Sequence, residues 1–253
     1  MKYAVVVGAS SGLGREACRQ LALEQNVDEI WLIARREERL KELASTLPKP
    51  SKIFAIDICN YGELIPLIDA HEVALSNGNT LTWLVLAAGR GIPSRFDDKP
   101  EYLSTINLNI EALTHMASFF LPYLKGNALL FSSVAAFLPQ PGFAVYAASK
   151  SYVLSLSRAL NCEFKNATIT AVCPNPVETE FFLQGDNQRE ISRIKSIGVE
   201  SAEKVISTAI KRSKKGKDIS ISSPIAKLIN FFAKILPHSW ILKLGQKVKF
   251  FES

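Results

Sequence analysis

The sequence of 253 residues predicts an α/β protein with one doubly wound parallel sheet of about seven strands and a helical C-terminal extension. Short apolar, β-branched runs alternate with stretches of helical spacing, a pattern typical of parallel strands joined by helical crossovers. A glycine-rich turn follows the first run, and small or polar residues end several others. Because ligands of such sheets bind beyond the carboxyl ends of the strands, we expect these residues to share one site.

The first expected strand is Tyr3–Val7, and a glycine-rich turn leads from it into an amphipathic helix that reaches about Gln25. Glycines at this point allow backbone N–H groups at the helix start to approach a pyrophosphate. Strand, turn and helix occur in the order that dinucleotide binding requires. The expected contacts from this segment are Gly8, Ser10, Ser11, Gly12, Leu13 and Gly14.

The second expected strand, Glu29–Ala34, lacks the terminal acid that would accept a hydrogen bond from the ribose 2′-OH of NAD, and Arg35 follows it. The guanidinium groups of Arg35 and Arg15 suit a 2′-phosphate, so we predict NADP(H) rather than NAD(H). Arg36 and Arg39 are assigned instead to the solvated face of the next helix.

The third expected strand, Lys52–Ile56, ends at Asp57 and Ile58, which we assign to the cofactor site. Asp57 could accept a hydrogen bond from the adenine amino group or cap the next helix, and the sequence leaves both open. The fourth strand is Leu81–Leu86, and small residues after it would let a cofactor lie against the backbone. These residues are Ala87, Ala88 and Gly89.

A long helix is expected from about residue 100 to residue 121, with Asn107 and Asn109 in its middle. Asparagine is a poor residue for a helix interior, which indicates a role for these side chains. The alternative is that both lie at a helix irregularity or on the surface.

A buried strand, Ala128–Phe131, leads to Ser133 and then to a loop rich in proline and glycine. The helix that begins near Ala144 places Tyr146 and Lys150 one turn apart on the same face. An ammonium group near a phenol lowers its pKa from about 10, so Tyr146 would serve as an acid or base near neutrality. By itself this spacing is more often an exposed helix pair.

The sixth expected strand, Thr168–Cys173, is followed by further expected cofactor contacts. They are Pro174, Asn175, Val177 and Thr179. Residues 181–199 have little periodicity and are predicted to form a substrate flap. A helix over 201–212 and a short strand over 218–221 complete the catalytic domain, which we expect to span residues 1–222.

In combination these motifs resemble the short-chain dehydrogenase/reductase family over about residues 3–180, with Gly-x-x-x-Gly-x-Gly at Gly8 and Tyr-x-x-x-Lys at Tyr146. The resemblance implies a Rossmann-like fold and interconversion of a carbonyl and an alcohol by hydride transfer. The implied catalytic residues are Asn107, Ser133, Tyr146 and Lys150. Tyr146 would exchange the proton, Lys150 would hold the nicotinamide ribose, and Asn107 would keep a relay water.

Two segments depart from the family pattern. Leu86-Ala-Ala-Gly replaces Asn-Asn-Ala-Gly, and Pro174-Asn replaces Pro-Gly. Neither departure removes a catalytic group. The alternative functions are a non-catalytic NADP(H)-binding regulatory module, which the filled catalytic positions disfavour, or a protein that docks on a membrane or partner.

The net charge of +6 is unevenly distributed. Residues 201–253 have 11 Lys and Arg against 3 Asp and Glu, a net +8, whereas the remainder has 19 against 21, a net −2. This distribution disfavours nucleic-acid binding. Four scattered cysteines and three distant histidines indicate a reducing cytoplasm and no metal site. The apolar run at the N-terminus is too short for a signal peptide and is expected to form the first strand, and no segment is expected to span a membrane.

The expected tail, 223–253, combines broad apolar faces with lysines. It could pack on the catalytic domain, join copies into a homodimer or homotetramer, cover an apolar carbonyl or alcohol substrate, or lie on an anionic membrane.

Overall fold

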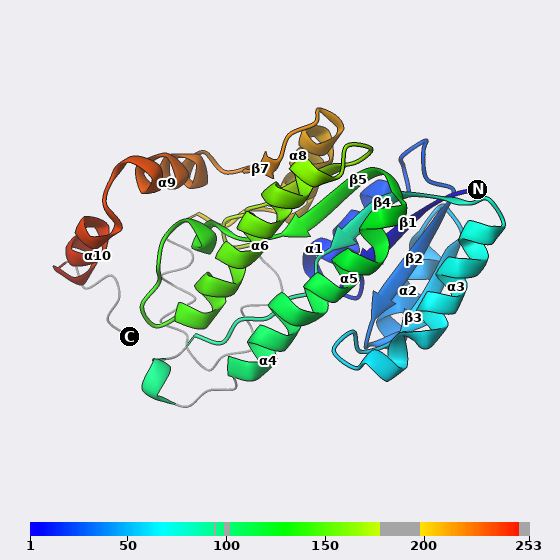
Figure 1. Ribbon diagram of the computed structural model, residues 1–253, viewed down its shortest axis with the longest axis horizontal. Helices are drawn as coiled ribbons and strands as arrows, with labels where there is room; N and C mark the ends of the chain where they lie inside the picture. Colours follow the sequence, from blue (N-terminus) through cyan, green and yellow to red (C-terminus); the bar gives the residue numbers. More distant parts are fainter. Residues whose placement is uncertain (94, 99–101, 178–197, 248–253) are drawn as a thin grey trace.

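The computed structural model describes residues 1–93, 95–98, 102–177 and 198–247, and it contains the predicted seven-stranded parallel sheet (Figure 1). The strand order is β3-β2-β1-β4-β5-β6-β7. The strands are β1 (Lys2–Val7), β2 (Glu29–Ala34), β3 (Ser51–Ala55), β4 (Thr80–Leu86), β5 (Leu124–Phe131), β6 (Thr168–Val172) and β7 (Ile219–Ser220). The order reverses between β1 and β4, which is where doubly wound sheets bind ligands.

Helices cover both faces of the sheet, because alternate strand residues point to opposite sides. Ala4 and Val6 of β1 face a core that includes α1 (Gly12–Leu21), α2 (Glu37–Thr46) and α8 (Ala202–Lys214). Val5 and Val7 face the other core. That core includes α3 (Ile65–Ser76), which follows η1 (Tyr61–Leu64), together with α5 (Leu113–Phe120) and α6 (Ala144–Glu163).

The predicted helix over 100–121 is interrupted in its middle. It consists of α4 (Tyr102–Ile106), the π-helical turn η3 (Asn107–Ala112) and α5, and η4 (Leu121–Tyr123) joins α5 to β5. A π turn adds a residue to the helical repeat and often occurs at functional sites. Both asparagines therefore lie at a helix irregularity, as the alternative prediction stated, and Asn107 is exposed whereas Asn109 is completely buried.

The C-terminal helices α9 (Pro224–Ile235) and α10 (His238–Lys247) follow β7 and extend from the end of the molecule farthest from β3 (Figure 1). Ala226 of α9 is buried in a small core with Phe137 and Ile221. Phe137 ends η5 (Val134–Phe137). Within the described residues, no helix is both long and apolar enough to cross a membrane.

Several predicted boundaries need adjustment. Helix α1 ends at Leu21 rather than near Gln25, because the chain turns to bury Ala22 and Val27 in the core. Strand β7 is two residues long instead of four. Thr179 and most of the predicted flap, 181–197, lie outside the described residues.

Candidate active site

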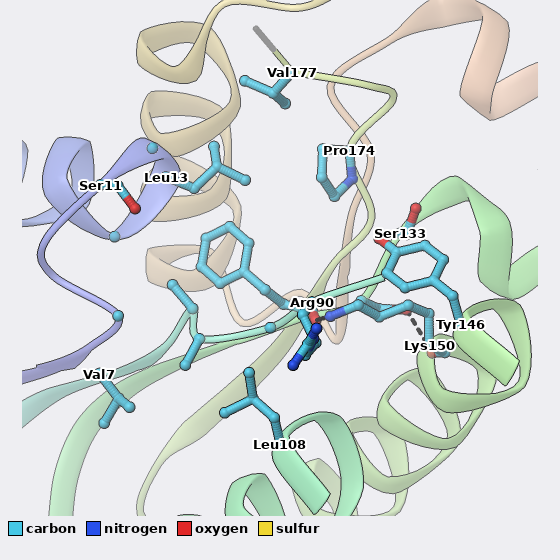
Figure 2. A pocket seen from close by; sticks show the side chains of 18 of the residues that line it. Val7, Ser11, Leu13, Arg90, Leu108, Ser133, Tyr146, Lys150, Pro174 and Val177 are labelled. Atoms are coloured by element: carbon cyan, nitrogen blue, oxygen red, sulfur yellow. Dashed lines mark hydrogen bonds between the residues drawn. The ribbon is translucent and has the colours of Figure 1, made fainter. Parts of the chain in front are cut away.

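A cavity of about 800 Å³ opens at the carboxyl ends of the central strands (Figure 2). Of the predicted site residues that the structure describes, all except Arg15 line it. They are Gly8, Ser10, Ser11, Gly12, Leu13, Gly14, Arg35, Asp57, Ile58, Ala87, Ala88, Gly89, Asn107, Ser133, Tyr146, Lys150, Pro174, Asn175 and Val177. The cavity therefore joins the glycine-rich turn to the tyrosine–lysine pair.

The glycine-rich turn packs closely against the exit of β4. Gly8 has a φ of +89°, and a β-carbon there would come within 2.7 Å of the backbone nitrogen of Ala88. Ser11 precedes α1 but makes no side-chain capping hydrogen bond. The first-turn N–H groups of α1 thus lack a side-chain cap at the cavity wall, an arrangement that fits the pyrophosphate of a dinucleotide.

The arginines near the end of β2 are arranged differently from the prediction. Arg15 lies outside the cavity lining, because its guanidinium forms a 2.6 Å ion pair with Glu42 of α2. Arg36, which was assigned to the solvated helix face, lines the cavity and donates a 3.3 Å hydrogen bond to the Ser10 hydroxyl. Arg35 also lines the cavity, so two guanidinium groups remain at this wall.

Asp57 is held beside Arg35, with 3.7 Å between carboxylate and guanidinium. Its carboxylate also accepts a 3.0 Å hydrogen bond from the backbone N–H of Cys59. The helical turn that follows begins at Tyr61 and is capped by Asn60. The helix-cap alternative for Asp57 is therefore wrong, and its place in the cavity wall is consistent with the adenine end of a dinucleotide.

Ser133, Tyr146 and Lys150 meet in one part of the cavity (Figure 2). Ser133 accepts a 3.1 Å hydrogen bond from the Ala135 N–H, and its hydroxyl also hydrogen-bonds to Tyr146. The Lys150 ammonium donates a 2.9 Å hydrogen bond to the Phe131 carbonyl and lies 5.6 Å from the centre of the Tyr146 ring.

Burial shifts the pKa values of Tyr146 and Lys150. It raises the pKa of Tyr146 to about 12, although the hydrogen bond from Ser133 acts in the opposite direction. Burial also lowers the pKa of Lys150 to about 8. The pKa of Tyr146 is therefore raised and not lowered as predicted, because desolvation of the phenol outweighs its hydrogen bond with Ser133.

Asn109 is the polar residue of η3 that reaches the catalytic helix. Its side chain accepts a 2.9 Å hydrogen bond from the Arg90 N–H and donates one of 2.8 Å to the Arg90 carbonyl. It also donates to the Ser149 hydroxyl. A β-carbon at Gly89 would come within 3.1 Å of the Lys150 ammonium and 3.3 Å of the Asn109 carbonyl, so the three residues are neighbours.

The Pro174-Asn turn is held by the asparagine side chain. Asn175 is only 3% exposed, and its amide donates to the Gly198 carbonyl and, at 3.0 Å, to the Ser223 hydroxyl. Its backbone N–H donates to Glu200. These contacts fasten the cavity wall to the start of α9.

Three residues at or beside the cavity were not predicted from the sequence. Arg90 could have been identified as a charged residue directly after the small-residue exit of β4. Ser149 gave no signal, and neither did Phe143, whose ring stacks on Tyr146 with centroids 4.3 Å apart.

Comparison with known proteins decides the family, since residues 2–190 match the family model described as short chain dehydrogenase. The chain belongs to the short-chain dehydrogenase/reductase family. Sulfoacetaldehyde reductase 2 of Chromohalobacter salexigens is 32% identical over 191 residues, covering 71% of this chain and 74% of the relative.

Two solved structures of short-chain dehydrogenases share the fold. The enzyme from Sphingobium yanoikuyae in complex with NADPH has a TM-score of 0.76 and 22% identity, covering 99% of this chain and 95% of the other. The enzyme from Mycobacterium paratuberculosis bound to NAD has a TM-score of 0.74 and 20% identity, covering 89% and 98%. This short-chain dehydrogenase/reductase is thus an oxidoreductase of a family that uses NAD(H) or NADP(H).

Proposed function

We propose that the protein interconverts a carbonyl and an alcohol with NADP(H), and that Tyr146 is the general acid and base. The observation that carries this proposal is the meeting of Ser133, Tyr146 and Lys150 in the cavity that also receives the start of α1. When bound, the cofactor supplies or accepts the hydride.

In reduction, Tyr146 donates its proton to the carbonyl oxygen. A pKa of about 12 keeps the phenol protonated near neutral pH, so it is ready to act as an acid. The Ser133 hydroxyl, next to Tyr146, supplies a second hydrogen bond that orients the same oxygen. The Lys150 ammonium, 5.6 Å from the centre of the ring, would attract the phenolate left after proton transfer.

We assign a positioning role to Asn109 and leave Asn107 as an exposed residue of the cavity wall. Asn109 is fully buried and fixes both the backbone of Arg90 and, through Ser149, the helix that carries Tyr146. The contacts of Asn109 thus support a positioning role, which differs from the relay-water role that the family resemblance attached to Asn107.

The preference for NADP(H) is carried by Arg35 and Arg36. Both line the cavity after β2, where Ala34 takes the place of the acid that suits an unphosphorylated ribose. Titration of the protein with NADPH and NADH, followed by nicotinamide fluorescence, tests the assignment. We expect NADPH to bind at least about tenfold more tightly, because charge-assisted hydrogen bonds to phosphate are strong. Tighter binding of NADH would contradict it.

We propose an apolar carbonyl or alcohol as the substrate, because Pro93, Val134 and Phe143 line the cavity and Phe143 stacks on Tyr146. A screen of apolar and charged ketones with NADPH tests this class. A purely regulatory, cofactor-binding role is the competing function. The regulatory role would gain support if NADPH bound tightly while no carbonyl in the screen was reduced.

We further propose that the protein is a cytoplasmic homodimer or homotetramer. Size-exclusion chromatography with light scattering tests the oligomeric state.

A further inference from the structure

Helix α9 has two apolar faces, and within the described part of the chain only one of them is packed against other residues. Ala226 is 0% exposed, and Ile229 and Ala233 are partly buried against the core of Phe137 and Ile221. This face fixes α9 to the catalytic domain.

The other apolar face of α9 is exposed. Successive helical residues are about 100° apart, which places five side chains in one arc of about 120°. They are Ile225, Leu228, Phe231, Phe232 and Ile235, and they are 42–57% exposed. Leu236 and Trp240 continue the exposed surface into α10, and Trp240 is 67% exposed. We call these seven residues the tail face.

The tail face concentrates apolar surface to an unusual degree. Among the described residues, 17 large apolar side chains are exposed, and these seven lie within 16 consecutive positions. A contiguous apolar patch on a soluble protein usually marks a binding surface.

Positive charge borders the tail face. Lys227 and Lys234 are exposed and lie at its edge by helical position, and Lys243 is exposed on α10. The sequence has no acidic residue from 219 to 251. The surface is therefore both apolar and basic, which is the chemistry of a helix that lies at an anionic membrane interface.

We propose that the tail face docks on the surface of a bilayer that contains anionic lipids. Apolar side chains would enter the boundary between headgroups and acyl chains, and the lysines would contact the headgroups. A second copy is the less suitable occupant. In a two-fold dimer the same patch would face itself, so lysines would meet without an acid in this segment to neutralise them.

The docking face has a fixed position relative to the active site. The Ser223 hydroxyl caps α9 by accepting a 3.3 Å hydrogen bond from the Ala226 N–H, and it accepts another from Asn175 in the cavity wall. Helix α9 also packs against η5, which directly follows Ser133. The two helices project from the end of the molecule farthest from β3 (Figure 1).

The first test is binding of the full chain to vesicles, which does not depend on catalysis. We expect flotation with phosphatidylcholine vesicles that contain about 30% phosphatidylserine, and weaker flotation with phosphatidylcholine alone or at high salt. Trp31 and Trp83 are buried, so a blue shift of tryptophan emission on adding vesicles would report Trp240. Failure of the wild-type chain to bind anionic vesicles would overturn the proposal.

Two variants test which side chains bind. Replacing two lysines, Lys227→Gln with Lys234→Gln, should weaken binding to anionic vesicles at least about tenfold, since each lysine near such a surface contributes about fivefold. Replacing Leu228→Gln with Ile235→Gln should abolish the emission shift while leaving NADPH affinity unchanged. The matched control is Leu23→Gln, at a 75% exposed position outside the tail face, which should bind like wild type.

The same variants distinguish a bilayer from a second copy of the chain as the occupant of the tail face. If Leu228→Gln with Ile235→Gln left vesicle binding unchanged, the tail face would not be the surface that contacts the bilayer, and the proposal would be overturned. A wild-type dimer that this double variant converts to monomers, without any flotation of the wild type, would assign the face to a second copy and overturn the proposal.

Discussion

The side-chain amide of Asn109 donates a 2.9 Å hydrogen bond to the hydroxyl of Ser149. Ser149 in turn donates a 2.7 Å hydrogen bond to the carbonyl of Tyr146. The π-helical turn is thereby joined to the helix that carries Tyr146, the proposed proton donor, and the buried amide contacts that helix without lining the cavity itself.

We expect Asn109→Ala to lower the free energy of unfolding by about 1–3 kcal/mol, because it leaves buried polar partners at Arg90 and Ser149 unsatisfied. Turnover should fall by as much as about 100-fold, since small displacements of catalytic groups cost that much. Thermal unfolding and the separate measurement of kcat and KM check this.

Asn107→Ala is the comparison for that variant, because its exposed side chain should contribute little to stability. A larger loss of stability and kcat in Asn107→Ala than in Asn109→Ala would reverse our assignment.

Tyr146→Phe should reduce kcat by about 10²–10⁴-fold while NADPH still binds, because the variant lacks the proton donor but keeps the ring. Tyr152→Phe on the same helix is the matched control, since its hydroxyl lies 2.8 Å from that of Thr114 and not at the cavity. Retained activity in Tyr146→Phe would contradict the proposed mechanism.

Arg36→Ala should weaken NADPH binding at least about tenfold and leave NADH binding nearly unchanged, because only the phosphorylated ribose offers an anion to this side chain. Arg15→Ala should leave the ratio of the two affinities unchanged, since Arg15 is bound to Glu42. Fluorescence titration of both cofactors measures the ratio. If Arg15→Ala alone removed the preference, the original sequence prediction would be restored.

Stability should depend on pH through His71, which is 1% exposed and 2.8 Å from the Tyr3 hydroxyl. Burial lowers the pKa of His71 to about 4, below its value of about 6.5 in the unfolded chain. Between pH 4 and pH 6.5, His71 is protonated in the unfolded chain but neutral in the folded protein, so the unfolded chain binds one more proton. The free energy of unfolding should therefore fall by up to about 3 kcal/mol as the pH decreases from 6.5 to 4.

Urea denaturation at several pH values measures this effect of His71. His71→Phe should flatten the dependence in this range, whereas the exposed His115→Gln should retain it. An unchanged slope in His71→Phe would show that another group is responsible.

The fold could be predicted from the sequence because strand and helix periodicities alternate along most of the chain up to Cys173, and the predicted site residues follow strand ends. The directions in which individual side chains point could not be predicted. Arg15 and Arg36 both suit a phosphate by type, but Glu42 on a neighbouring helix captures Arg15. Asn107 and Asn109 are two residues apart, and the π turn that separates their environments has no sequence signature of its own.

The tail shows the same limit of sequence reasoning. Its lysines and apolar residues indicated an amphipathic segment, but the division of α9 into packed and exposed faces depends on the position of η5. The hydrogen bonds of the Asn175 side chain could not be predicted either, because its partners Gly198 and Ser223 lie far along the chain.

Val177 pairs with Glu200 in an isolated parallel bridge, and Asn175 bonds to Gly198. The chain between these residues therefore departs from and returns to a single place beside the cavity. Because the entropy of closing a loop grows only slowly with its length, insertions and deletions there would cost the sheet little stability. Changes in the length of this segment would therefore leave Val177 and Asn175, and with them this part of the cavity wall, in place.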